Sequence, residues 1–175
     1  MSLVKVFLTT ILLCVATNAL AQHQHDSKNH QPYADLKGRD IKALSQQQID
    51  DLKAGKGMSL ALAAELNGYP GPSHVLELAD QLKLNEKQKK RMQEMFKAMT
   101  KETKILGVTV IEAERKLDTL FKSKTVNEQN LKEATLKISE AQAKLREAHL
   151  RYHLSTLAVL SKEQVDTYNR LRGYR

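Results

Sequence analysis

Apolar and small residues recur at intervals of seven through the second half of the chain. One set comprises Met92, Met99, Leu106, Ala113 and Leu120, and a second set, displaced by four, comprises Phe96, Thr103, Val110 and Leu117. The alternation resumes after Asn127 at Leu131, Ile138, Leu145, Tyr152 and Val159, interleaved with Ala134, Ala141, Ala148 and Ser155. This spacing is typical of a helix packed along another helix. With only the polar residues 122–126 between them, the two helices are expected to form an antiparallel hairpin, each about 50 Å long at about 1.5 Å per residue.

A five-residue motif brackets this hairpin. It reads Leu84-Asn85-Glu86-Lys87-Gln88 before the first long helix and Leu160-Ser161-Lys162-Glu163-Gln164 after the second. In each copy a capping residue precedes Gln by three positions, which predicts a capping box and hence a helix start. A weaker copy is Leu44-Ser45-Gln46-Gln47-Gln48, and Thr125 with Glu128 offers a further box.

The first twenty-one residues predict export. Lys5 precedes an apolar run, and Ala19-Leu20-Ala21 has the small-x-small form of a signal peptidase site, so cleavage is expected after Ala21. Ile11, Leu12 and Leu13 exclude a lipoprotein signal at Cys14, because that cleavage needs a small residue directly before the cysteine. The mature chain then has no cysteine, no disulfide and no span of membrane length. A periplasmic location is expected.

The net charge limits the classes of partner that the chain is expected to bind. The chain carries 28 Lys and Arg against 20 Asp and Glu, a formal net charge of +8, and it has no Trp. Basic proteins often bind nucleic acid, but export removes that partner. Acidic polymers, anionic membrane surfaces and acidic stretches of other proteins remain.

Four segments are expected along the chain. Residues 1–21 form the signal peptide, and 22–40 a mobile tail containing His23, His25 and His30. Residues 41–72 form an extension with a short helix capped by Ser45, an apolar segment at 60–66 and a Pro/Gly turn. Residues 73–175 form the helical hairpin domain, with short helices at 73–83 and 161–172.

The second long helix carries a further apolar stripe, at Leu136, Ala143, Leu150, Leu154 and Leu157. It lies nearly opposite the seam, so one hairpin cannot bury both faces. A homodimer is favoured, and a closed four-helix monomer is the alternative.

These features together resemble the Spy/CpxP group of periplasmic proteins, the "LTxxQ" family. The resemblance covers residues 73–174 and rests on the paired motifs Leu84, Asn85, Gln88 and Leu160, Ser161, Gln164, with Asn85 and Ser161 standing where the family has Thr. It implies an all-α fold, usually a cradle-shaped dimer. Relatives include ATP-independent chaperones, stress-response modulators and CnrX-like and ZraP-like metal sensors, so the fold alone does not decide the function.

One candidate site is a client-binding surface on the first long helix. Met92, Met95, Phe96 and Met99 form a cluster that is either core or an adaptable apolar surface, and Lys89, Lys90 and Lys97 lie among them. The clients would be unfolded or misfolded envelope proteins. A sensor kinase or an anti-sigma factor is a further candidate partner.

The alternative is a heavy-metal sensor or resistance protein. His149 and His153 stand four apart on the second long helix, where both could bind one metal, with His74 as a third ligand. No cofactor is required; the candidate metals are Zn, Cu, Ni and Co. Catalytic motifs are absent from the sequence, and no enzymatic activity is expected.

Overall fold

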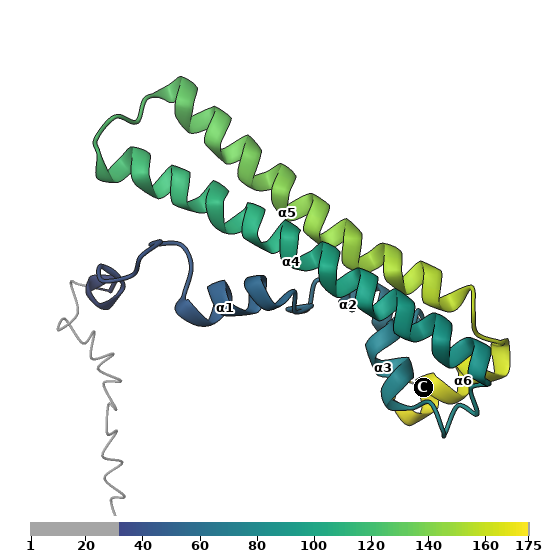
Figure 1. Cartoon of the computed structure of the whole chain (residues 1–175). Helices are drawn as coiled ribbons and strands as arrows, with labels where there is room; N and C mark the ends of the chain where they lie inside the picture. The colour runs from purple at the N-terminus through teal and green to yellow at the C-terminus, as the bar shows by residue number, and fades with distance from the viewer. Residues whose placement is uncertain (1–31, 175) are drawn as a thin grey trace, which may run out of the picture. The chain divides into compact units, whose positions relative to one another are not determined.

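The computed structural model describes residues 32–174, and the account below concerns the compact unit Asp35–Arg175. The predicted signal peptide, its cleavage site and the three tail histidines lie outside the described residues. Within residues 32–174 every regular element is helical, in agreement with the predicted all-α class. The elements are η1 (Ala34–Leu36), α1 (Gln46–Ala54), α2 (Leu62–Glu65), α3 (Pro72–Glu77), α4 (Glu86–Lys122), α5 (Glu128–Leu157) and α6 (Lys162–Leu171) (Figure 1).

Helices α4 and α5 form the predicted antiparallel hairpin. They contain 37 and 30 residues, which corresponds to about 55 and about 45 Å at about 1.5 Å per residue. Half of the predicted seam positions are buried, whereas Phe96, Leu131 and Ser155 are exposed. The buried ones are Met92, Met99, Thr103 and Val110 of α4, and Ala134, Ile138, Ala141, Leu145 and Ala148 of α5. Helix α5 ends at Leu157, before Val159, the last seam residue expected for it.

The turn of the hairpin corrects one prediction. Helix α5 is capped by Asn127, whose side chain accepts from the Asn130 N–H, and Asn130 returns the bond. Thr125 does not act as the cap, because its hydroxyl is hydrogen-bonded to Ser123 Oγ at 2.8 Å. Asn is at least as good an N-cap as Thr, so the helix begins two residues later than the Thr125 box predicts.

The two bracketing motifs meet in space. Each forms its predicted capping box, with Gln88 Oε1 accepting from the Asn85 N–H and Gln164 Oε1 from the Ser161 N–H. The two glutamine amides also donate to each other, at 2.9 and 3.1 Å between Nε2 and Oε1. Gln88 further donates to the Val159 carbonyl and Gln164 to the Leu82 carbonyl. This Gln88–Gln164 pair ties the start of α4 to the start of α6.

The extension before the hairpin packs onto it. Ser45 caps α1 in a complete capping box, as predicted, and Ile41, Ile49 and Leu52 share a core cluster with α4 and α5. A Cβ at Gly107 of α4 would lie 2.2 Å from the Leu52 carbonyl oxygen. Only glycine permits this approach, so Gly107 provides the place where α1 docks.

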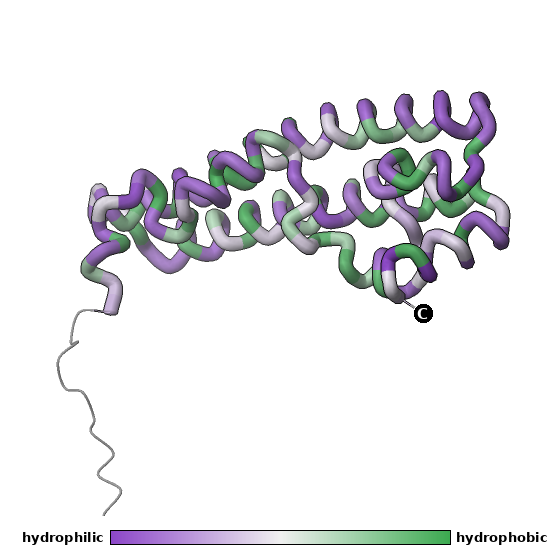
Figure 2. Tube along the Cα trace, turned by 90° about the horizontal axis from the view of Figure 1, so that it is seen from below, coloured by the Kyte–Doolittle hydropathy of each residue, from purple (hydrophilic) through white to green (hydrophobic). Residues whose placement is uncertain are grey.

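The other short elements are smaller than predicted. The helix expected at 73–83 spans only Pro72–Glu77, and the apolar segment at 60–66 forms a single helical turn that buries Ala64 and Glu65 rather than its leucines. These elements leave much of the second α5 stripe uncovered, since Leu136 and Leu154 remain 60% and 59% exposed. Figure 2 shows hydrophobic and hydrophilic residues alternating from turn to turn along both long helices. Among the described residues, no helix combines the length and apolarity that crossing a bilayer requires.

Candidate functional site

A pocket of about 540 Å³ lies against the first part of α4 and the last turns of α5, toward the open end of the hairpin. Five parts of the chain line it: the stretch between Ala54 and Glu65, the start of α3, the Phe96–Thr100 stretch of α4, His149 and His153 of α5, and Arg172 with Tyr174 after α6. Its volume falls within the range of small-molecule sites, about 300–1,000 Å³.

Glu65 is a buried acid at the wall of this pocket. Its Oε1 accepts hydrogen bonds from the hydroxyls of Tyr168 and Tyr174, and Arg172 Nε lies 3.8 Å away. Burial, and then the hydrogen bond to Glu65, raise the pKa of Tyr168, which keeps this phenol protonated as a donor. Glu65 therefore joins α2 to the C-terminal segment.

His153 lies against the same carboxylate. Its Nδ1 is 2.6 Å from the Tyr69 carbonyl oxygen, to which it must donate, and 3.6 Å from Glu65 Oε2. A Cβ at Gly71 would lie 2.9 Å from the imidazole Cε1, so the glycine of the Pro-Gly-Pro turn makes room for the ring. In neutral His153 this arrangement leaves Nε2 as the unprotonated nitrogen.

His149 lies one turn earlier and is 3% exposed. Burial, and secondly the proximity of His153, lower the pKa of His149, so its ring is neutral at pH 7. Its Nε2 and the Oε2 of Glu65 are buried without a hydrogen-bond partner among the described residues. Such atoms are uncommon in native structures and call for an explanation.

The structure thus brings the three predicted metal ligands to one pocket, since His74 also lines it. His74 is partly exposed, however, and its Nδ1 lies 3.0 Å from Glu77 Oε2. Across residues 32–174, no three His, Cys, Asp or Glu side chains converge as metal ligands.

The predicted client-binding residues separate into two groups. Met92, Met95 and Met99 are buried, and Met92 and Met95 belong to the core cluster with Val75 and Tyr168. Their side chains are therefore not on the surface, and of the four apolar residues only Phe96 is exposed, at 38%. Heptad position does not explain the difference, because Phe96 is a predicted seam residue and Met95 is not. Packing explains it: Met92 and Met95 lie against Val75 and Tyr168, whereas Phe96 lines the pocket.

The outer face of α4 carries a basic row of Lys90, Lys97, Lys101 and Lys104, which ends at the exposed Val108 with Ile105 beside it. Their spacing of three, four or seven residues places them along one side of the helix. Within the described residues none of these lysines has a carboxylate within 4.0 Å. Nearby acids are engaged elsewhere: Glu94 pairs with Arg91, and Glu102 with Arg151 of α5.

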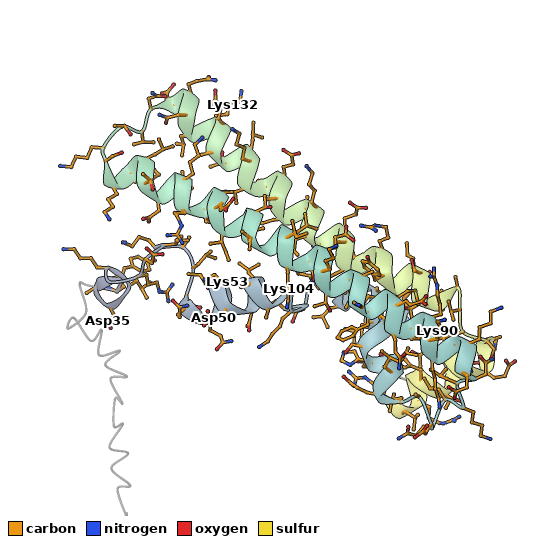
Figure 3. All side chains as sticks on the ribbon, viewed as in Figure 1. Asp35, Asp50, Lys53, Lys90, Lys104 and Lys132 are labelled. Carbon is orange, nitrogen blue, oxygen red and sulfur yellow. The ribbon has the colours of Figure 1, made fainter. Side chains whose placement is uncertain are left out.

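Lys89, the remaining predicted client-binding residue, lies apart from this row. It is half-buried and pairs with Asp80 and Glu86. Figure 3 labels Lys90 and Lys104 on α4, and Lys132 near the start of α5.

Sequence reasoning missed Glu65, Arg172 and Tyr174. A signal existed for Glu65, which is the one charged residue in the apolar segment 60–66. Its partners lie more than a hundred positions away, so no local pattern identifies them. Comparisons with family models, with curated proteins and with solved structures found no match, and the resemblance given above rests on the motifs alone.

Proposed function

We propose that this protein is a periplasmic, ATP-independent chaperone or envelope-stress accessory protein that holds unfolded polypeptides on the outer face of α4. One observation carries the proposal. The basic row has no acidic partners among the described residues, and it adjoins Ile105 and Val108, which are 60% and 40% exposed.

The lysines and the exposed apolar side chains would act on an unfolded client over different distances. Unneutralised lysines attract an acidic unfolded chain over roughly a Debye length, about 10 Å at 0.1 M salt. Exposed apolar side chains then make short-range contacts that are weak enough to release the client. Neither step needs a nucleotide or a catalytic residue, and no catalysis is proposed. The exported location, and a sensor kinase or anti-sigma factor as regulatory partner, belong to the same proposal.

The test is suppression of aggregation of a denatured acidic client, reduced α-lactalbumin, at equimolar ratio and low salt. The triple variant Lys90→Gln/Lys97→Gln/Lys101→Gln is expected to require roughly tenfold more protein for the same suppression, because each exposed charge contributes about 0.2–1 kcal/mol. Raising the salt concentration should likewise increase the amount of wild-type protein needed for the same suppression.

The matched control is Lys116→Gln/Lys132→Gln/Lys137→Gln, which removes equal charge from exposed positions outside the row. If the control loses as much activity as the row variant, net charge alone acts and the row is not the site. If the wild type fails to suppress aggregation at low salt, the holding function is refuted.

A second candidate function, metal sensing or buffering, is favoured by the geometry of His153. Its Nδ1 donates to a backbone carbonyl, which is the outer hydrogen bond that metal-ligating histidines usually make. Calorimetry with Zn²⁺, Cu²⁺, Ni²⁺ and Co²⁺ tests it, using His149→Ala/His153→Ala and a chain lacking residues 22–30. Binding tighter than about 10 µM (about −7 kcal/mol) that is lost in the double variant supports it, and no such binding refutes it.

We further propose that the protein is a homodimer paired through the second α5 stripe. The exposed Leu136, Ala143 and Leu154 support this, because they follow one face of α5 and a continuous apolar face in water indicates an interaction surface.

A further inference from the structure

The lining of the pocket contains two chemically different groups of side chains, which we call its apolar wall and its polar wall. One wall is apolar and is made by Met58, Leu62, Phe96 and Met99. The other carries His149, His153 and Arg172. A mostly apolar pocket with a few converging polar groups is the usual form of a small-molecule site.

The charged side chains of the polar wall favour a negatively charged ligand. Among the described residues the one acid that lines the pocket is Glu65, and its Oε1 is already occupied by two tyrosine hydroxyls and by Arg172. Arg172 is partly exposed, and a guanidinium has five N–H donors, of which Glu65 faces Nε. The remaining fork is suited to a carboxylate, which Arg recognises in bidentate fashion.

Two further observations point to an occupant. Met58 and Ser59, at the rim, both have left-handed backbone conformations, with φ of 43° and 66°. Consecutive non-glycine residues in this region are strained, and such strain concentrates at ligand-binding segments. The polar wall also contains His149 Nε2, a buried atom without a hydrogen-bond partner among the described residues.

We propose that this pocket binds a small amphiphilic carboxylate, with the apolar body against Met58, Leu62, Phe96 and Met99 and the carboxylate at the Arg172 guanidinium. The inference does not rest on the holding of unfolded chains by the outer face of α4, which this pocket does not include.

The probes are decanoate, decan-1-ol and decylamine, titrated into the full chain below their aggregation concentrations and followed by calorimetry. Decanoate is expected to bind in the micromolar range and at least about tenfold more tightly than decan-1-ol, with decylamine the weakest. Equal affinity for all three would overturn the carboxylate assignment, and no binding of any would overturn the site.

Gly57 provides a way to close the pocket. Its φ lies outside the left-handed region, and an added Cβ would have only His149 Cε1 and Nδ1, both at 4.0 Å, as its nearest neighbours. Gly57→Phe should therefore fill the pocket over His149 and weaken decanoate binding at least about tenfold. The matched control, Gly38→Phe, adds the same side chain where nothing lies within 4 Å and should leave binding unchanged.

Two further variants keep the test decisive if Gly57→Phe unfolds, which circular dichroism would reveal. Phe96→Ala removes part of the apolar wall and should weaken decanoate and decan-1-ol alike. Arg172→Gln should weaken decanoate and leave decan-1-ol unaffected. Unchanged decanoate affinity in both variants would refute the site. Suppression of client aggregation should remain in Gly57→Phe, so this inference and the proposed function fail separately.

Discussion

Glu65 is where three distant parts of the chain meet. Its carboxylate contacts His153 of α5, Tyr168 of α6 and the C-terminal Tyr174, although it sits on a helix of only four residues. A helix this short has almost no stability of its own. Its position is therefore held by tertiary contacts, namely the hydrogen bonds of Glu65 and the burial of Ala64 beside it.

Replacing Glu65 by Gln should lower the free energy of unfolding by about 1–3 kcal/mol, because buried donors lose a charged acceptor and the new amide group has no acceptor of its own. Urea unfolding followed by circular dichroism measures this. The control is Glu147→Gln, whose carboxylate is exposed and contacts Arg151 at 3.5 Å. Equal effects of the two changes would contradict a special role for the buried carboxylate.

His149 makes stability depend on pH. Its pKa is lowered in the folded protein, chiefly by burial, while an unfolded histidine takes up its proton near pH 6.5. Below that pH the unfolded state binds a proton that the folded state rejects, so stability should fall as pH drops from 7.5 to 5.5.

Urea unfolding at pH 7.5, 6.5 and 5.5 tests this, with His149→Gln expected to give the smaller loss. His74→Gln, at a partly exposed histidine paired with Glu77, serves as the control and should keep the wild-type dependence. Parallel curves for wild type and His149→Gln would show that another group is responsible.

Among the helices, the glutamine capping box has two different structural roles: it starts a helix, and in two copies it also joins two helix starts. All three glutamine capping boxes form, at Ser45, Asn85 and Ser161. Only the latter two are joined, since Gln88 and Gln164 donate to each other and to the backbone beyond. Local sequence predicts a helix start, whereas the pairing of two starts depends on how the chain folds back.

Glutamate at position 88 separates these two uses. Gln88→Glu keeps an oxygen that accepts from the Asn85 N–H, but it cannot donate to Gln164 or Val159. We expect it to lower the free energy of unfolding by about 1–3 kcal/mol, the cost of leaving buried acceptors unpaired.

The same change in the α1 box, Gln48→Glu, is the control, because among the described residues the Gln48 side chain is hydrogen-bonded only within the box. Chemical unfolding of both variants measures the difference. If they behave alike, the Gln88–Gln164 contact adds nothing to stability.

For the whole molecule, the sequence does not show what covers the second apolar stripe of α5. Neither α3 nor α6 buries it, so Leu136 and Leu154 stay exposed in the single chain. Placing charge there, in Leu136→Glu/Leu154→Glu, should abolish the proposed dimer, because it would bury unpaired carboxylates in the interface.

Sedimentation velocity over a range of concentrations measures this association. Ile105→Glu/Val108→Glu, at exposed apolar positions on α4, is the matched control and should leave the dimer intact. A monomeric wild type, or a dimer unaffected by the stripe variant, would refute the proposed pairing.

Local sequence patterns were enough to predict the helical framework. The seven-residue spacing and the capping boxes predicted the hairpin and the starts of α1, α4 and α6, because both signals depend on residues within a few positions of one another. The same reasoning placed the α5 cap at Thr125, since local rules rank several adjacent capping residues almost equally.

Which side chains reach the surface, and which of them contact one another, depends on how the helices pack. Met92, Met95 and Met99 are buried while Lys90 and Lys97 remain exposed, and this depends on which helices pack against α4. Glu65, His153 and Arg172 converge from three elements far apart in the chain. Such contacts follow from packing over long sequence separations, and no local spacing encodes them.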